Sequence, residues 1–166
     1  MSTFGLPPSP LRVFLVDDHE LIRHGLTFLL HDEPGFEVAG EASTTREALA
    51  LIPEVRPDVV VLDVRLPDGN GIDVCTELHS RLPDTRWLFL TAYDDEEALL
   101  AATSAGASGY LYKHTFGDEL IDALRTVGRG GSLIDPTRTK QVLARLRSAA
   151  EEHERQSGSR RHGTGS

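Results

Sequence analysis

The stretch RVFLVDDHE, residues 12–20, runs from apolar residues that predict a buried strand directly into two adjacent carboxylates, Asp17 and Asp18. Two such carboxylates repel each other by about 1 kcal/mol at ~4 Å in water, and by more in a less polar medium. A chain that places them at the end of a buried strand needs a compensating positive charge. We expect a divalent cation to supply that charge.

Outward from this stretch, apolar runs alternate with segments of helical periodicity. The sequence predicts strands over 11–16, 36–42, 57–64, 85–92 and 107–113, and helices over 19–31, 44–55, 71–81, 94–106 and 117–128. The run PDVVVLDV (57–64) is nearly all apolar, which is typical of a central parallel strand covered on both faces. Five alternating strand–helix units predict one α/β domain with a doubly wound, flavodoxin-like, five-stranded parallel sheet.

The segments around this domain are predicted to be less ordered. We expect a disordered N-terminus over 1–10, the α/β domain over 11–130, a linker with an amphipathic helix over 131–156, and a disordered tail over 157–166. An Asp-Pro pair gives that C-terminal helix a start signal. Its narrow apolar stripe consists of Val142, Leu143, Leu146 and Ala150.

Composition limits the classes of protein that fit. The 166 residues are 39% hydrophobic and 26% charged, as in an ordinary globular domain. The net charge is −9: seven basic and three acidic residues from Pro136 onward give +4, which leaves −13 for residues 1–135. An acidic body argues against direct nucleic-acid binding. The single cysteine, Cys75, excludes an internal disulfide, and the sequence predicts a cytoplasmic protein with no signal peptide and no membrane span.

Polar side chains follow four of the five predicted strands, where ligands bind in an open parallel sheet. They are Asp17 and Asp18 after the first strand, Asp63 at the end of the third, Thr91 at the end of the fourth, and Lys113 after the fifth. Three carboxylates form an all-oxygen site that suits Mg²⁺ better than a soft metal. We interpret His19, beside the acids, as a helix-start residue rather than a ligand, and a zinc site is disfavoured.

Four motifs lie at the ends of these strands: VDDHE, VLDVRLPDGNG, LTAY and GASGYLYK. With their spacing, residues 10–130 resemble the receiver domain of two-component response regulators. The residues of these motifs are most similar to those of the LuxR/NarL-type branch, whose members end in a helix-turn-helix. Within that branch they are most similar to actinobacterial hypoxia and dormancy regulators.

The resemblance implies that a histidine kinase phosphorylates Asp63. It also implies that Asp18, Asp63 and the backbone carbonyl of Arg65 hold Mg²⁺, with Asp17 acting through water. Lys113 would then face the phosphoryl oxygens.

The same resemblance assigns a switch to two further residues. Thr91 would donate its hydroxyl to the phosphoryl group, and Tyr110 would be the aromatic residue drawn inward when Thr91 moves. Gly69 and Gly71 fit the sharp turn after the acceptor, where a positive φ favours glycine.

The C-terminus departs from the pattern of that branch. Only about 16 residues follow Ala150, without the apolar pattern of a helix-turn-helix, so the chain is either a truncated piece or a single-domain regulator. It is not expected to bind DNA specifically by itself. We expect a homodimer through the apolar stripe and the fifth domain helix, while folding back of the stripe onto the monomer stays open as an alternative.

Two other functions are compatible with parts of the sequence. A small Mg²⁺-dependent phosphatase or hydrolase would use the same acids, although haloacid-dehalogenase enzymes place theirs as Asp-x-Asp rather than Asp-Asp-His. In a flavodoxin-like electron carrier, three acids would repel a flavin phosphate. The sequence therefore favours a phosphoacceptor switch, with at most self-catalysed phosphorylation and dephosphorylation, over an enzyme.

Overall fold

The structure, a computed structural model, describes residues 9–91, 96–113, 117–134 and 136–164. The chain divides into two compact units, residues 1–134 and residues 135–166. Most of the predicted disordered N-terminus lies outside the described residues, so that prediction stays untested.

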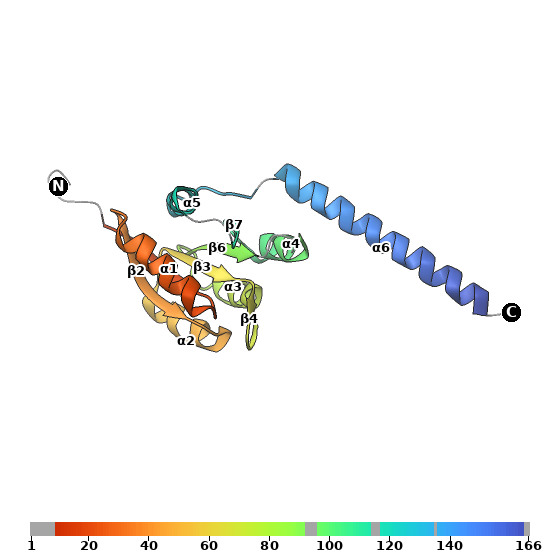
Figure 1. Ribbon diagram of the computed structural model, residues 1–166, viewed down its shortest axis with the longest axis horizontal. Coiled ribbons are helices and arrows are strands. Elements are labelled where there is room, and N and C mark those ends of the chain that lie inside the picture. Colours follow the sequence, from red (N-terminus) through yellow and green to blue (C-terminus); the bar gives the residue numbers. More distant parts are fainter. Residues whose placement is uncertain (1–8, 92–95, 114–116, 135, 165–166) are drawn as a thin grey trace. The chain divides into compact units, whose positions relative to one another are not determined.

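The first unit is built on a five-stranded parallel sheet (Figure 1). Its strands are β1 (Leu11–Val16), β2 (Phe36–Ala42), β3 (Val59–Asp63), β6 (Arg86–Thr91) and β7 (Gly109–Tyr112), in the order β2-β1-β3-β6-β7. In the register of the central strands, Val16 pairs with Leu62 and Asp63 with Leu90. The carboxyl ends of β1, β3 and β6 therefore meet at one edge, and the predicted fold class is confirmed.

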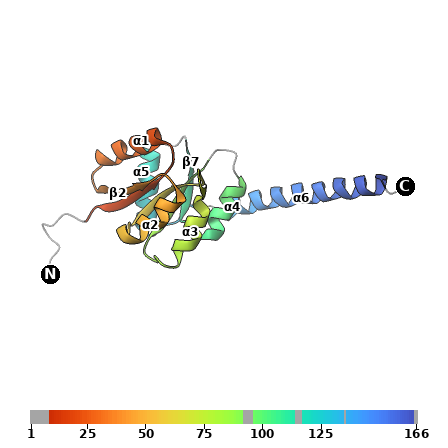
Figure 2. The ribbon, with the colours of Figure 1, turned by 90° about the horizontal axis from the view of Figure 1, so that it is seen from below.

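Helices cover both faces of this sheet (Figure 2). The helices α1 (Glu20–His31) and α5 (Asp118–Gly128) pack on one face, and α2 (Thr45–Val55), α3 (Gly71–His79) and α4 (Glu96–Ala105) pack on the other. Successive side chains of a strand point to opposite faces, so Val13 and Leu15 enter the α1/α5 core while Phe14 and Val16 enter the other. This two-sided burial explains why the strands read as continuous apolar runs.

Each apolar side chain that enters these cores stabilises the fold by about 1.5–3 kcal/mol relative to its exposure to water. The largest buried side chains are Trp87, Phe14 and Phe89. Cys75 lies fully buried in the same cluster, and burial raises the pKa of its thiol to about 12. This fits a small core residue rather than a nucleophile.

The loop after β3 contains two short strands that the sequence did not indicate. Strand β4 (Arg65–Leu66) pairs antiparallel with β5 (Gly69–Asn70), on either side of the turn at residues 67–68. Two-residue strands have no periodicity to detect. Gly69 has a positive φ, as expected, but Gly71 does not. A Cβ on Gly71 would lie 2.1 Å from the backbone oxygen of Asp63, so the reason for glycine there is close approach of two backbone segments.

The structure decides between the two candidate N-caps of α2 and extends the C-terminal helix beyond its predicted end. Of the two candidate caps of α2, Thr44 is the N-cap, and its side chain accepts a hydrogen bond from the backbone N–H of Glu47. In the second unit, α6 (Pro136–Thr164) continues beyond Gln156, where the sequence predicts a disordered tail. An established helix adds one hydrogen bond for each residue that joins it, and this opposes termination at the Ser-Gly-Ser segment. The helix therefore extends past residue 156, and the predicted disorder of residues 157–166 stays a prediction.

Within the described part of the chain, no helix combines the length and the apolar character that crossing a bilayer requires.

We predict that Gly71→Ala destabilises the protein. The added methyl group collides with the Asp63 backbone, and such overpacking costs about 1–3 kcal/mol in the free energy of unfolding. Gly25→Ala is the matched control: Gly25 is exposed inside α1, where alanine is favoured over glycine by about 1 kcal/mol. Urea unfolding should show opposite signs for the two variants. Equal stability of Gly71→Ala and the wild type would contradict the close approach.

Candidate functional site

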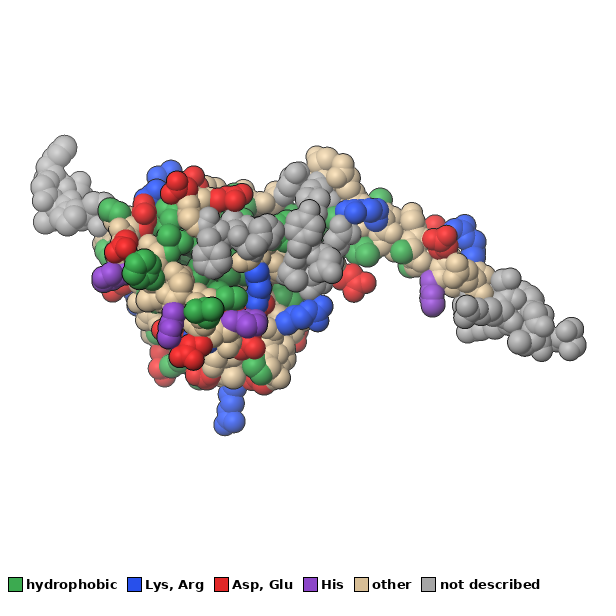
Figure 3. All heavy atoms as spheres, viewed as in Figure 1, with side chains coloured by type: hydrophobic (Ala, Val, Ile, Leu, Met, Phe, Trp, Pro, Cys, Tyr) green, Lys and Arg blue, Asp and Glu red, His purple; other side chains and the backbone are tan. Residues whose placement is uncertain are grey.

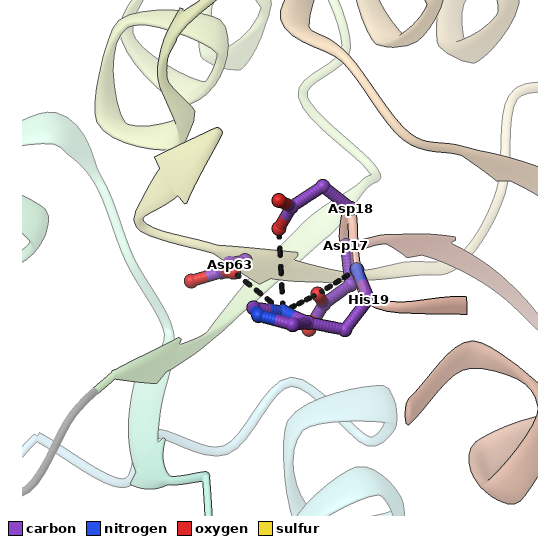
Figure 4. A group of neighbouring side chains, drawn as sticks. All are labelled: Asp17, Asp18, His19 and Asp63. Carbon is purple, nitrogen blue, oxygen red and sulfur yellow. Dashed lines mark hydrogen bonds and ion pairs between the residues drawn. The ribbon is translucent and has the colours of Figure 1, made fainter. Parts of the chain in front are cut away.

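Three carboxylates meet at the carboxyl edge of the sheet. Asp17 follows β1 and Asp63 ends β3; both are almost fully buried, at 1% and 3% exposure, while Asp18 is exposed. One carboxylate oxygen from each residue and a ring nitrogen of His19 all lie within 4.8 Å of one another (Figure 4). The structure therefore brings together the acids that the sequence placed on separate strands.

Lys113, which directly follows β7, reaches this cluster across β6. Its Nζ donates to Oδ2 of Asp63 at 2.6 Å and lies 3.6 Å from Oδ2 of Asp17. Its backbone N–H donates to the carbonyl of Thr91 at 2.9 Å, which anchors the end of β7 to β6. One ammonium group thus contacts both buried carboxylates.

Burial raises the pKa of the Asp63 carboxyl above its ordinary value. The hydrogen bond from Lys113 works in the opposite direction, and the negative charge of Asp17 adds to the upward shift. The net effect is a carboxylate that is costly to ionise without further positive charge. Such a perturbed group in a cleft is a candidate for function.

His19 adds a ring nitrogen to this cluster, which the sequence interpretation did not predict. It is the N-cap of α1, as expected of a helix-start residue, but its side chain makes no capping hydrogen bond. Its Nδ1 instead lies 2.8 Å from Oδ1 of Asp17, 3.3 Å from Oδ1 of Asp18 and 4.0 Å from Oδ2 of Asp63 (Figure 4). The two nearest carboxylates belong to the residues directly before His19, while Asp63 is brought to the ring by the neighbouring strand β3.

The loop after β3 is held at its start and at its tip. The backbone N–H of Arg65 donates to Oδ1 of Asp63 at 3.3 Å. At the tip, the Asp68 carboxylate accepts from the backbone N–H groups of Thr45 and Arg46, at 2.8 and 3.1 Å, in the first turn of α2. These hydrogen bonds lower the pKa of Asp68. The loop is therefore attached to a neighbouring helix, a contact that the sequence did not predict.

The two predicted switch residues lie on the neighbouring strands. Thr91 ends β6 and is buried, with 2% exposure. Tyr110 lies on β7, half-buried against the core under α2, α3 and α4. A cavity of about 340 Å³ opens above the cluster, lined by Asp18, His19, Asp63, Arg65, Pro67 and Lys113.

The surface of residues 9–134 carries charges of both signs. On the face in Figure 3, acidic and histidine side chains lie among hydrophobic ones, and the described Lys and Arg side chains are scattered rather than gathered into one patch.

The comparisons with known proteins agree with this geometry. The response regulator receiver domain family matches residues 13–125. The chain belongs to this family. It is therefore the receiver domain of a two-component response regulator, and the phosphatase alternative is not favoured.

Relatives of this receiver are transcriptional regulators. The chain is 53% identical over 148 residues to the DNA-binding transcriptional activator DevR/DosR of Mycobacterium tuberculosis, covering 89% of this chain and 68% of that protein. It is 35% identical over 147 residues to the transcriptional regulatory protein DegU of Brevibacillus brevis, covering 89% of this chain and 62% of DegU. The chain thus spans roughly two thirds of the relatives that it matches.

A solved structure supports the same assignment. A LuxR-family two-component response regulator from an Aurantimonas species is 34% identical, with a TM-score of 0.72, and the match covers 84% of this chain and 99% of that one. The predicted resemblance to LuxR/NarL-type regulators is confirmed.

The stability of the metal-free receiver should depend on the ionisation of Asp63. Because burial raises its pKa in the folded state, its contribution to stability is present below the unfolded pKa of about 3.9 and is lost as pH rises through the folded pKa. Asp63→Asn is neutral at every pH. It should raise the free energy of unfolding at pH 7 by on the order of 1 kcal/mol, the size of one close like-charge repulsion.

Urea unfolding in chelator, at pH 7 and at pH 4, measures this effect. The advantage of Asp63→Asn should shrink at pH 4. A variant that is less stable than the wild type at pH 7 would show that the Lys113 ion pair outweighs the cost of burying the charge.

Asp68→Ala should loosen the loop without disturbing the core. The first-turn N–H groups of Thr45 and Arg46 lose their acceptor, so their amide hydrogens should exchange faster with solvent. Asp73→Ala, which removes an exposed acid from the first turn of α3, is the control. Amide exchange followed by NMR distinguishes the variants, and unchanged exchange at both positions in Asp68→Ala would contradict the anchor.

Proposed function

We propose that Asp63 is the phosphoacceptor of this receiver and that a sensor histidine kinase is its phosphoryl donor. The observation that carries the proposal is the placement of Asp63: a buried carboxylate at the end of the central strand, 2.6 Å from Lys113 Nζ, at the floor of an open cavity. A nucleophile in this position is reachable by a phosphoryl group and has a cation beside it.

In the proposed step, a carboxylate oxygen of Asp63 attacks the phosphorus of a phosphohistidine. The new O–P bond forms as the P–N bond breaks, and the electron pair of the P–N bond leaves with the imidazole nitrogen of the kinase. Phosphoryl transfer needs mainly positioning and neutralisation of the oxygens. Lys113 supplies one positive charge at Asp63, and we assign to it the contact with the transferred group.

The side chains present fit a divalent cation. Oδ2 of the buried Asp17 has no hydrogen-bond partner among the described residues, and three carboxylates offer the oxygen ligands that Mg²⁺ prefers. We propose that Asp18, Asp63 and the Arg65 backbone carbonyl hold Mg²⁺, with Asp17 contributing through water. When bound, the ion offsets the charge of the acids and of the phosphoryl oxygens.

The switch that we propose uses the strand next to the acceptor. The hydroxyl of Thr91 would donate to a phosphoryl oxygen, and Tyr110 would move with it. Their support is position: Thr91 ends β6, one residue after Leu90, the register partner of Asp63, and Tyr110 lies on the adjacent edge strand β7. Inward movement of Tyr110 would alter the outer surface of the sheet edge, where a partner could detect it.

Asp63→Asn tests the acceptor. The wild type, mixed with acetyl phosphate and Mg²⁺, should gain the mass of one phosphoryl group, and Asp63→Asn should gain none because its amide is not a nucleophile. Asp73→Asn on α3 should be modified like the wild type. Full modification of Asp63→Asn would transfer the role to Asp17 or Asp18, whereas rapid release of phosphate from an unmodified wild type would favour the hydrolase.

We further propose that the receiver works as a homodimer through α6 and α5, in the cytoplasm where its kinase would act. The support is the apolar stripe of α6, which a single helix cannot bury on its own. Of the stripe, Val142 is buried and Leu146 is half-buried, while Leu143 and Ala150 are exposed and remain available to a partner.

Leu146→Glu tests the dimer. Placing a carboxylate in the stripe should weaken self-association at least tenfold, since an unpaired charge is costly to bury. Gln141→Glu, an exposed position of the same helix, should leave association unchanged. Sedimentation with and without phosphoryl donor is the measurement, and a wild type that stays monomeric at high micromolar concentration in both states contradicts the proposal.

A further inference from the structure

The ring of His19 points away from the helix that it begins. Its side chain is 55% exposed, so no packing forces it into the cluster, and yet Nδ1 lies among the carboxylate oxygens of Asp17, Asp18 and Asp63 (Figure 4). The backbone N–H of His19 also donates to Oδ1 of Asp17, at 2.8 Å. The backbone N–H and the ring of His19 are therefore both directed at the carboxylate of Asp17.

Nδ1 has more neighbours than one nitrogen can satisfy. It lies 2.8 Å from Asp17 Oδ1, an acceptor, and 3.3 Å from Lys113 Nζ, a donor. A protonated Nδ1 donates to Asp17 but cannot accept from Lys113, and an unprotonated Nδ1 accepts from Lys113 but leaves Asp17 without that bond. A cation among the carboxylates removes the conflict, because it takes the lone pair of Nδ1 and the charge of the acids together.

A second, independent observation points to a ligand here. Asp17 is 1% exposed, and its Oδ2 has no hydrogen-bond partner among the described residues; Lys113 Nζ lies 3.6 Å from it. An orphaned buried carboxylate oxygen is costly. Metal–oxygen and metal–nitrogen bonds of about 2.0–2.2 Å place opposite ligands roughly 4 Å apart, close to the 4.8 Å limit within which these four ligand atoms lie.

We infer that His19 Nδ1 is a direct ligand of the divalent cation at this site, which makes the site prefer transition-metal ions such as Mn²⁺ and Ni²⁺ over Mg²⁺. The inference rests on the proposed cation site. Three carboxylates alone suit Mg²⁺, whereas an added imidazole favours first-row transition metals, least for Mn²⁺ and more for Ni²⁺, because affinity for nitrogen ligands rises along the series. His19 is thereby a specificity-determining residue for the metal rather than a capping residue of α1.

The test compares metal binding by the wild type, His19→Gln, and His24→Gln, which alters an exposed histidine of the same helix. Titration calorimetry with MnCl₂, NiCl₂ and MgCl₂ gives the affinities. His19→Gln should weaken Mn²⁺ and Ni²⁺ binding at least about tenfold, the loss typical of disturbing a metal shell, and should change Mg²⁺ binding much less. His24→Gln should behave like the wild type.

Pulsed electron paramagnetic resonance of the Mn²⁺-loaded wild type gives a direct readout that does not depend on any variant folding. A ¹⁴N coupling from a bound imidazole should appear, should persist in His24→Gln and should vanish in His19→Gln.

Asp18→Ala separates failure of the inference from failure of the proposed site. Mg²⁺ binding that is lost in Asp18→Ala, together with no ¹⁴N coupling in the wild type, overturns the role of His19 and leaves the acidic site standing. Binding of neither Mg²⁺ nor Mn²⁺ by the wild type overturns both. An unchanged ratio of Mn²⁺ to Mg²⁺ affinity in a folded His19→Gln likewise overturns the inference.

Discussion

The contact between Asp63 and Lys113 constrains the rest of the receiver. Two nearly buried carboxylates, Asp63 and Asp17, lie side by side, and burial already disfavours ionisation of Asp63. The ammonium of Lys113 is the positive charge that contacts both. A lysine at the end of β7 reaches β1 and β3 only if β6 alone separates β7 from β3, which is the order that the sheet has. The electrostatics of the site and the topology of the sheet therefore require each other.

Much of this arrangement was predictable because it depends on local signals. Continuous apolar runs identified the central strands β1, β3 and β6, since both faces of the sheet are covered there, and the acids stood out because they end two of those runs. The rule that ligands bind at the carboxyl ends of parallel strands then brought Asp17, Asp18 and Asp63 to one edge without any coordinates. The positions of these side chains follow from where each strand ends, and the end of the apolar run marks that point.

The features that escaped prediction depend on contacts between distant segments. Asp68 anchors the loop to the first turn of α2, more than twenty positions earlier in the chain, and an Asp-Gly pair alone reads as an ordinary turn. Gly71 is required by the backbone of Asp63 rather than by its own φ angle. The ring of His19 lies against Asp17, and the sheet brings a carboxylate on β3 and a lysine after β7 to the same nitrogen. Each depends on tertiary geometry for which the sequence has no periodic signal.

The adjacent carboxylates Asp17 and Asp18 lie in two different environments, and this difference reduces the repulsion between them. Asp17 is buried, and one of its oxygens accepts from the backbone of His19, so this carboxylate also shapes the turn from β1 into α1. Asp18 is exposed and lines the mouth of the cavity, where water screens its charge. The two side chains therefore do not share one low-dielectric space. Of the pair, Asp18 is the one that an incoming cation can reach directly from solvent.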